Sequence, residues 1–197
     1  MSTAKINKVE ELFRKQSGVM WTHEVLSQGI HRRTLYAMRD MGLLERLGRG
    51  VYNPPLGNLD LVAVAKRVPE GVICLISALA YHGITTQVPH EVYLAISRVT
   101  RYPQIEYPPV RSYRFSEAAF KAGVEEYEID NAPVRINSPE KTIADCFKYR
   151  NKLGLDTAVE ALKLYRERKK LRVDKILEYA AICRVVNVIK PYLEATL

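Results

Sequence analysis

The chain has few cysteines and no long apolar run, and these two features argue against a disulfide-rich secreted protein and against a membrane-spanning protein. Its 197 residues include only Cys74, Cys146 and Cys183, which are odd in number and widely spaced. That pattern predicts reduced, buried thiols and a cytoplasmic protein. The longest apolar stretch, Val72–Tyr81, has about half of the roughly 20 residues that span a bilayer, so no transmembrane helix and no membrane partner are expected. No secretory signal is expected either, because the first residues run into charged ones without an apolar segment.

Signatures of catalysis and metal binding are also absent from the sequence. It contains no Gly-Ser dipeptide, and therefore no Gly-Ser-x-x-x-Asp nucleotidyltransferase signature, and it has no P-loop and no Gly-x-Ser-x-Gly elbow. Its histidines, His23, His31, His82 and His90, lack metal-ligand spacing with one another and with the cysteines. We therefore expect no enzymatic activity, no cofactor and no metal.

What the sequence does have is an uneven excess of positive charge. It carries 30 Lys and Arg against 22 Asp and Glu, a net charge of +8 at pH 7. Residues 1–52 carry +4, residues 53–140 carry −2, and residues 141–197 carry +6. A polyanionic partner is the default for a basic chain, with nucleic acid ahead of a membrane surface. Charge alone leaves a protein that binds no nucleic acid equally open.

A proline- and glycine-rich segment, Asn53-Pro54-Pro55-Leu56-Gly57-Asn58, divides the chain. It predicts an N-terminal domain over 1–55 and a second domain over 56–197. The overall expectation is an α+β fold, in which a winged helix-turn-helix precedes a mixed α/β domain with a small antiparallel sheet and C-terminal helices. In the second domain we expect helices at 59–67, 138–150, 156–169 and 174–188, an apolar helix or strand at 72–82, and strands at 91–97, 110–115 and on either side of Asp130–Pro133.

The first domain reads as three helices followed by a hairpin. Helical spacing and glycine stops predict helices at about 5–16, 22–28 and 31–41, then strands at 43–46 and 50–52 joined by a turn at Leu47–Arg49. Val19–Trp21 reads as a short, extended entry to the second helix. On the third helix, Ile30, Leu35, Met38 and Met41 are expected to face the core.

The opposite face of the third helix is the candidate DNA-binding surface. Arginines at the N-terminal end of a recognition helix can reach base edges in the major groove, and an arginine-bearing hairpin can act as a wing on the backbone or in the minor groove. A solvated basic face of an ordinary three-helix bundle, or a winged helix used for protein contact, stays open as an alternative. The candidate DNA-binding residues are His31, Arg32, Arg33, Thr34, Tyr36, Arg39, Arg46 and Arg49.

Several other conspicuous residues have simple structural interpretations. The lone Trp21 is expected in the core between helices. Cys146 is expected to be a buried structural thiol, and Lys141 with Asp145 a solvated contact on one helix. The small-residue stretch Ser77–Gly83 predicts tight packing, with a partner-contact role as the alternative.

Four stretches carry a family resemblance: Gly42–Tyr52, Ser77–Gly83, Val92–Ile96 and Ser138–Phe147, with Pro-Glu-Lys-Thr-x-x-Asp in the last the most specific. In this order and spacing they resemble the AbiEi family of antitoxins, the transcriptional-regulator half of AbiE-type, type IV toxin–antitoxin systems linked to abortive phage infection. The resemblance implies a repressor that binds inverted repeats in double-stranded promoter DNA and autoregulates its operon. It also implies an antitoxin to a nucleotidyltransferase-like toxin, with direct contact left open. A protein–protein adaptor without specific DNA binding is the alternative.

A second cluster of basic residues lies near the middle of the basic segment 141–197. It comprises Lys163, Arg166, Arg168, Lys169, Lys170 and Arg172. One interpretation is a second basic surface that extends the DNA contact. The alternative is that these residues are solvated helix faces and a basic loop.

Overall fold

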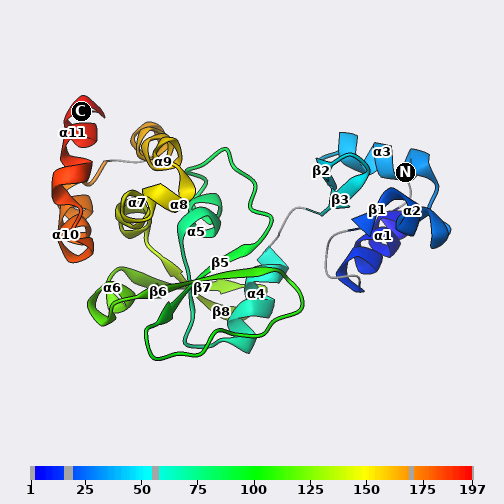
Figure 1. Ribbon diagram of the computed structural model, residues 1–197, viewed down its shortest axis with the longest axis horizontal. Helices are drawn as coiled ribbons and strands as arrows, with labels where there is room; N and C mark the ends of the chain where they lie inside the picture. Colours follow the sequence, from blue (N-terminus) through cyan, green and yellow to red (C-terminus); the bar gives the residue numbers. More distant parts are fainter. Residues whose placement is uncertain (1–2, 16–19, 55–57, 169–170, 197) are drawn as a thin grey trace.

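The computed structural model describes residues 3–15, 20–54, 58–168 and 171–196. The described residues form two bodies in Figure 1, the N-terminal unit (up to residue 54) and the C-terminal unit (from residue 58). The buried hydrophobic cluster of the N-terminal unit contains no residue of the C-terminal unit. The predicted boundary between residues 55 and 56 falls outside the described residues.

The N-terminal unit packs three helices against a small antiparallel sheet. The strand order is β1-β3-β2. Of the predicted extended entry Val19–Trp21, the described residues Met20 and Trp21 form a strand that pairs with β3, and Val19 lies outside the described residues. The hairpin turn lies at Arg49–Gly50, so it begins two residues later and ends one residue later than the predicted turn, Leu47–Arg49. Gly50 supplies the turn's positive φ of 78°, and a bulge between Arg46 and Gly48 shifts the register. The elements are α1 (Thr3–Lys15), β1 (Met20–Trp21), α2 (Thr22–Ser27), α3 (Arg32–Asp40), β2 (Glu45–Gly48) and β3 (Val51–Asn53).

Two core predictions for this unit are wrong. Trp21 is 51% exposed, because successive residues of a strand point to opposite sides and Met20 takes the buried side of β1. Met41 is 55% exposed, because it follows the last helical residue of α3 and has left the buried face of that helix. Leu35 and Met38 are fully buried, as predicted.

The C-terminal unit contains a five-stranded sheet of order β6-β5-β4-β8-β7. It is mixed rather than antiparallel as predicted, since β4 pairs parallel with β8 and β5 parallel with β6. The chain passes from β5 to β6 through a long connection over 98–109, the length that a parallel crossover requires. The strands are β4 (Val72–Ile73), β5 (Val92–Ser97), β6 (Val110–Phe115), β7 (Val124–Ile129) and β8 (Ala132–Asn137).

Helices cover both faces of this sheet. Val92, Leu94 and Ile96 of β5 pack in the cluster that contains α4, whereas Tyr93 and Ala95 pack in the cluster that contains α5, α7 and α9–α11. Burial on both faces explains why β5 is apolar at every position from 92 to 96. The helices are α4 (Asn58–Arg67), α5 (Leu75–Tyr81), α6 (Glu117–Lys121), α7 (Pro139–Lys148), α8 (Arg150–Leu153), α9 (Leu155–Arg168), α10 (Val173–Cys183) and α11 (Val186–Thr196).

Capping residues in the sequence predict some helix ends correctly and fail to predict others. Ser138 caps α7 by accepting a hydrogen bond from the Lys141 N–H, and Pro139 follows in the first turn, as predicted. The predicted long helix from Asp174 to Val188 is two helices, because Arg184 adopts a left-handed conformation (φ 59°) that ends α10. The short helix α6 had no predicted counterpart. Among the described residues, no helix has the length and apolarity needed to cross a bilayer.

Candidate nucleic-acid interface

Helix α3 begins at its two adjacent arginines. His31 is the N-cap, and its Nδ1 accepts a hydrogen bond from the Arg33 backbone N–H at 3.1 Å. This bond satisfies one of the amide groups that a helix start leaves unpaired. His31 therefore has a structural role at the start of the helix, and Arg32 and Arg33 occupy the first turn.

The polar face of α3 points to solvent. Arg32, Arg33, Tyr36 and Arg39 are exposed, whereas Thr34 is half-buried. Leu35 holds the opposite face in the core. The predicted division of α3 into a buried apolar face and an exposed basic face is therefore confirmed, apart from Met41.

The structure brings five of the eight candidate residues around one hollow of about 490 Å³, here called the arginine hollow. Arg32, Tyr36 and Arg39 come from α3, and Arg46 and Arg49 come from the β2–β3 hairpin. His31, Arg33 and Thr34 do not line it. The hollow's remaining lining residues are Thr22, Gly50 and Tyr52.

Hydrogen bonds hold the hairpin against the start of α2. The backbone N–H of Thr22 donates to the Gly50 carbonyl at 2.7 Å, and the Thr22 hydroxyl donates to the same oxygen at 3.0 Å. This double contact fixes the turn that carries Arg49 relative to the helices. A contact between two residues 28 positions apart has no local signal in the sequence.

The electrostatic character of the arginine hollow is cationic. Four guanidinium groups line it and no carboxylate does. Arg39 pairs with the neighbouring Asp40, 2.5 Å from Nη2 to Oδ1, and the hydrogen bond to Asp40 raises the pKa of Arg39. The Arg39 guanidinium also lies 5.4 Å from the centre of the Tyr36 ring. The hollow can therefore accept anionic groups such as backbone phosphates.

The second predicted basic surface is divided in the structure. Lys163 and Arg166 of α9 line a hollow of about 480 Å³ together with the acidic Glu167. Arg172 turns to Glu140, 3.5 Å away, and Arg168 donates to the Gly83 carbonyl. Lys169 and Lys170 lie outside the described residues. The described members therefore do not gather at one site.

Lys141 and Asp145 form a buried ion pair, so the predicted solvated contact is wrong. Both side chains are fully buried, and Lys141 Nζ lies 2.5 Å from Asp145 Oδ2. The carboxylate also accepts hydrogen bonds from Asn137 Nδ2 at 3.0 Å and from Cys183 Sγ at 3.2 Å. Burial raises the pKa of Asp145, an effect that the charge of Lys141 opposes. The most specific of the family-like stretches thus builds the centre of the C-terminal unit.

The thiol and small-residue predictions agree with the structure. Cys74, Cys146 and Cys183 are buried and free. Burial raises the pKa of the Cys146 thiol above its ordinary value, and that of Cys183 to about 12, so both stay protonated near neutral pH. Ser77 packs inside, where its hydroxyl accepts the Tyr93 N–H at 3.0 Å. Among the described residues, no group of three or more histidine, cysteine or acidic side chains is placed to hold a metal ion.

Comparison with known proteins identifies the class to which the N-terminal unit is similar. Residues 7–55 match the family model described as "Transcriptional regulator, AbiEi antitoxin". The match agrees with the family resemblance over the N-terminal unit, where the first of the four stretches, Gly42–Tyr52, lies; the other three stretches fall outside the matched residues.

No curated protein matches the chain. Among solved structures, the crystal structure of the RV2827C protein from Mycobacterium tuberculosis is similar, with a TM-score of 0.45 and 14% sequence identity. The alignment covers 98% of this chain and 82% of that one.

Proposed function

We propose that this protein is a sequence-specific DNA-binding repressor whose N-terminal unit acts as a winged helix-turn-helix. In this proposal α2 and α3 are the helix-turn-helix, α3 is the recognition helix, and the β2–β3 hairpin is the wing. The observation that carries the proposal is the arginine hollow, where guanidinium groups of α3 and of the hairpin converge. A duplex contacts these two elements together in winged-helix binding.

Each part of the surface has a separate task in this mechanism. Arg32 and Arg33, in the first turn of α3, enter the major groove, where arginine can pair bidentately with guanine. Arg46 and Arg49 hold the backbone or the minor groove beside it. Arg39 and Tyr36 contact phosphates between these two regions.

The operon-level part of the proposal is what the family resemblance implies, and the match of residues 7–55 to a transcriptional-regulator model supports it. The protein would bind inverted repeats in its own promoter, repress the operon, and act as antitoxin to a nucleotidyltransferase-like toxin. The C-terminal unit would neutralise the toxin. A variant that no longer binds DNA would therefore still protect cells that express the toxin.

The test measures, by fluorescence anisotropy, the affinity of the protein for a duplex of its own promoter and for a shuffled duplex of equal length, at the same salt concentration. Arg32→Ala with Arg33→Ala is expected to lower promoter affinity by about tenfold or more for each arginine and to remove the preference over shuffled DNA. The single tryptophan, Trp21, is exposed beside Thr22 of the arginine hollow and provides an intrinsic fluorescence signal for the same titration.

The matched control removes the same charge elsewhere. Lys121→Ala with Lys190→Ala deletes two exposed lysines of α6 and α11, each in a surface ion pair, and should leave the sequence preference intact. An Arg32→Ala, Arg33→Ala protein that still distinguishes promoter from shuffled DNA would contradict the proposal.

One observation favours the adaptor alternative. Trp21, Tyr36 and Met41 are large apolar side chains that the N-terminal unit leaves 41–55% exposed, and such residues are enriched in protein interfaces. An adaptor would bind a protein partner tightly and show no preference for promoter over shuffled DNA, so the same titration distinguishes the two functions.

A further inference from the structure

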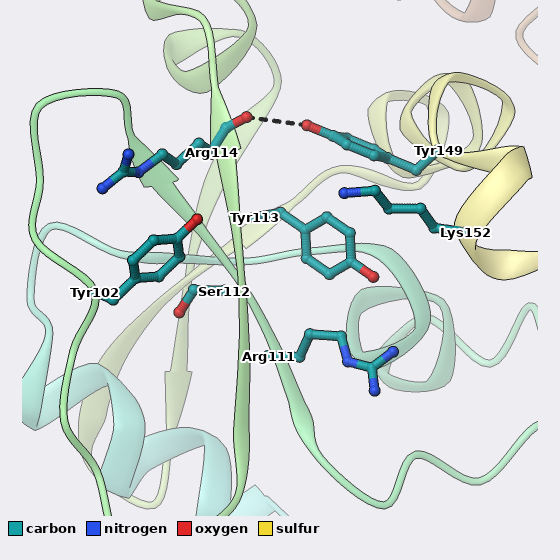
Figure 2. Close-up of a pocket in the computed structure, with 7 residues that line it drawn as sticks. All are labelled: Tyr102, Arg111, Ser112, Tyr113, Arg114, Tyr149 and Lys152. Carbon is teal, nitrogen blue, oxygen red and sulfur yellow. Dashed lines mark hydrogen bonds between the residues drawn. The ribbon is translucent and has the colours of Figure 1, made fainter.

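A second cationic hollow, remote in sequence from the arginine hollow, lies at the edge of the five-stranded sheet. It has a volume of about 520 Å³ and is lined by consecutive residues of β6 together with side chains from the preceding loop and from α8 (Figure 2). Strand β6 is the end of the strand order and pairs only with β5 among the described strands. We call it the β6 hollow.

The β6 hollow extends over both faces of its strand. Because side chains alternate along a strand, Arg111 and Tyr113 lie on one face and Ser112 and Arg114 on the other. Figure 2 shows this division, with Lys152 on the side of Arg111. An occupant would therefore lie across the strand edge and meet cations from both sides.

The backbone at this edge also presents donors to the hollow. The Pro109 carbonyl accepts the Val92 N–H of β5, so odd-numbered residues direct their amide groups toward β5. The even-numbered Ser112 and Arg114 then direct theirs away from the sheet, and the Arg114 carbonyl indeed accepts the Tyr149 hydroxyl at 3.1 Å. The outward N–H groups of Ser112 and Arg114 can donate to an anion at the edge.

Three positive side chains and no carboxylate line the β6 hollow. Each cation lies near an aromatic ring: Arg114 is 4.5 Å from the centre of Tyr102, and Lys152 is 5.6 Å from that of Tyr113. Arg111 is oriented by Glu91, 2.6 Å from its Nε. These contacts place the charges before any ligand arrives, which lowers the cost of ordering them on binding.

We infer that the β6 hollow binds a nucleotide. The polyphosphate would bridge Arg114 on one face and Arg111 with Lys152 on the other, and the outward amides would donate to its oxygens. The base would stack on the ring of Tyr102, a residue that is 57% exposed and whose ring already lies against the Arg114 guanidinium. The hollow's volume is within the range of small-molecule sites.

The experiment titrates the full-length protein with each of the four ribonucleoside triphosphates by isothermal calorimetry. Arg114→Ala with Lys152→Ala is expected to weaken binding by about tenfold or more for each cation, as for hydrogen bonds to charged groups. Tyr102→Ala should weaken the binding of nucleoside triphosphates several-fold and leave the affinity for inorganic tripolyphosphate unchanged. Because the substituted side chains are on the surface, circular dichroism and thermal unfolding should match the wild type.

Two controls separate this site from the proposed DNA surface. Arg32→Ala with Arg49→Ala, which removes two arginines that line the arginine hollow, must leave nucleotide affinity unchanged; this excludes binding at that hollow. Lys121→Ala with Lys190→Ala must also leave it unchanged, which excludes a general effect of net charge. Conversely, Arg114→Ala with Lys152→Ala must leave promoter affinity and its salt dependence unchanged.

Three outcomes would overturn the inference. The first is that no nucleoside triphosphate binds. The second is that tripolyphosphate binds as tightly as the nucleotides, which leaves no role for the base. The third is that Arg114→Ala with Lys152→Ala reduces the salt slope of DNA binding by nearly two, which would make the β6 hollow a phosphate contact of the DNA.

Discussion

At the scale of single residues, environment separates side chains that are alike in sequence. Lys141 and Lys121 each form an ion pair with an acidic residue four positions away on the same helix. The Lys141–Asp145 pair is fully buried, however, and the Lys121–Glu117 pair is exposed. An exposed pair contributes little, whereas removing one partner of a buried pair leaves an uncompensated charge. The same spacing therefore matters little for stability at the exposed pair and much at the buried pair.

This difference gives a residue-scale prediction. Lys141→Met should destabilise the protein by about 3–5 kcal/mol, because Asp145 would stay buried without its cation. Urea unfolding followed by circular dichroism measures the loss, and Lys121→Met is the matched control, with an expected change near zero. Lys141→Met with Asp145→Leu should recover much of the stability. A single Lys141→Met variant as stable as the control would show that the ion pair has no such weight.

At the scale of elements, the β2–β3 hairpin links local conformation to the proposed site. Its turn depends on Gly50, whose φ of 78° is unfavourable for other residues and whose carbonyl receives both hydrogen bonds from Thr22. A residue with a Cβ would strain that turn by roughly 1–2 kcal/mol. Arg49 is adjacent, so a change in the turn moves a guanidinium of the arginine hollow.

We therefore expect Gly50→Ala to weaken promoter binding as well as to destabilise the N-terminal unit. Gly29 is the matched control, since it has nearly the same φ of 77°, has open space around it, and does not line the arginine hollow. Gly29→Ala should lower stability by a similar amount and affect DNA affinity less. Anisotropy titration and thermal unfolding report the two effects, and equal losses of affinity in both variants would argue against a role for the hairpin.

At the scale of the whole molecule, the hydrophobic clusters predict two responses to mutation. Leu35 is buried in the cluster of the N-terminal unit, and Leu162 in the cluster around α7 and α9. Among the described residues, Glu45 of the N-terminal unit lies 3.2 Å from His90 of the C-terminal unit, and such a partly exposed pair contributes little to stability.

Leu35→Ala and Leu162→Ala should each cost about 2–5 kcal/mol within their own unit. Hydrogen–deuterium exchange is expected to rise among residues 3–54 in the first variant and among residues 58–196 in the second. Exchange that rises across both ranges in either variant would show that the two units unfold as one.

Much of the local structure could be predicted from the sequence, because its causes are local. The basic face of α3 follows from the spacing of Leu35 and Met38, and the start of α7 follows from Ser138 and Pro139. The end of α10 at Arg184 could not be predicted, since a left-handed arginine has no marker comparable to glycine. The candidate arginines on α3 and the hairpin follow from local pattern, whereas Tyr52 joins them through strand pairing and Thr22 through its hydrogen bonds to Gly50.

The sequence alone is enough to predict most of the helices and strands, the placement of arginines on one helix and one hairpin, and the reduced state expected of the thiols. Each depends on residues within a few positions of one another. Tertiary structure alone decided that Trp21 is exposed, that Lys141 and Asp145 are buried, and that β6 is a sheet edge with cations on both faces. Burial and edge position depend on which distant segments pack together, and short-range periodicity carries no information about that choice.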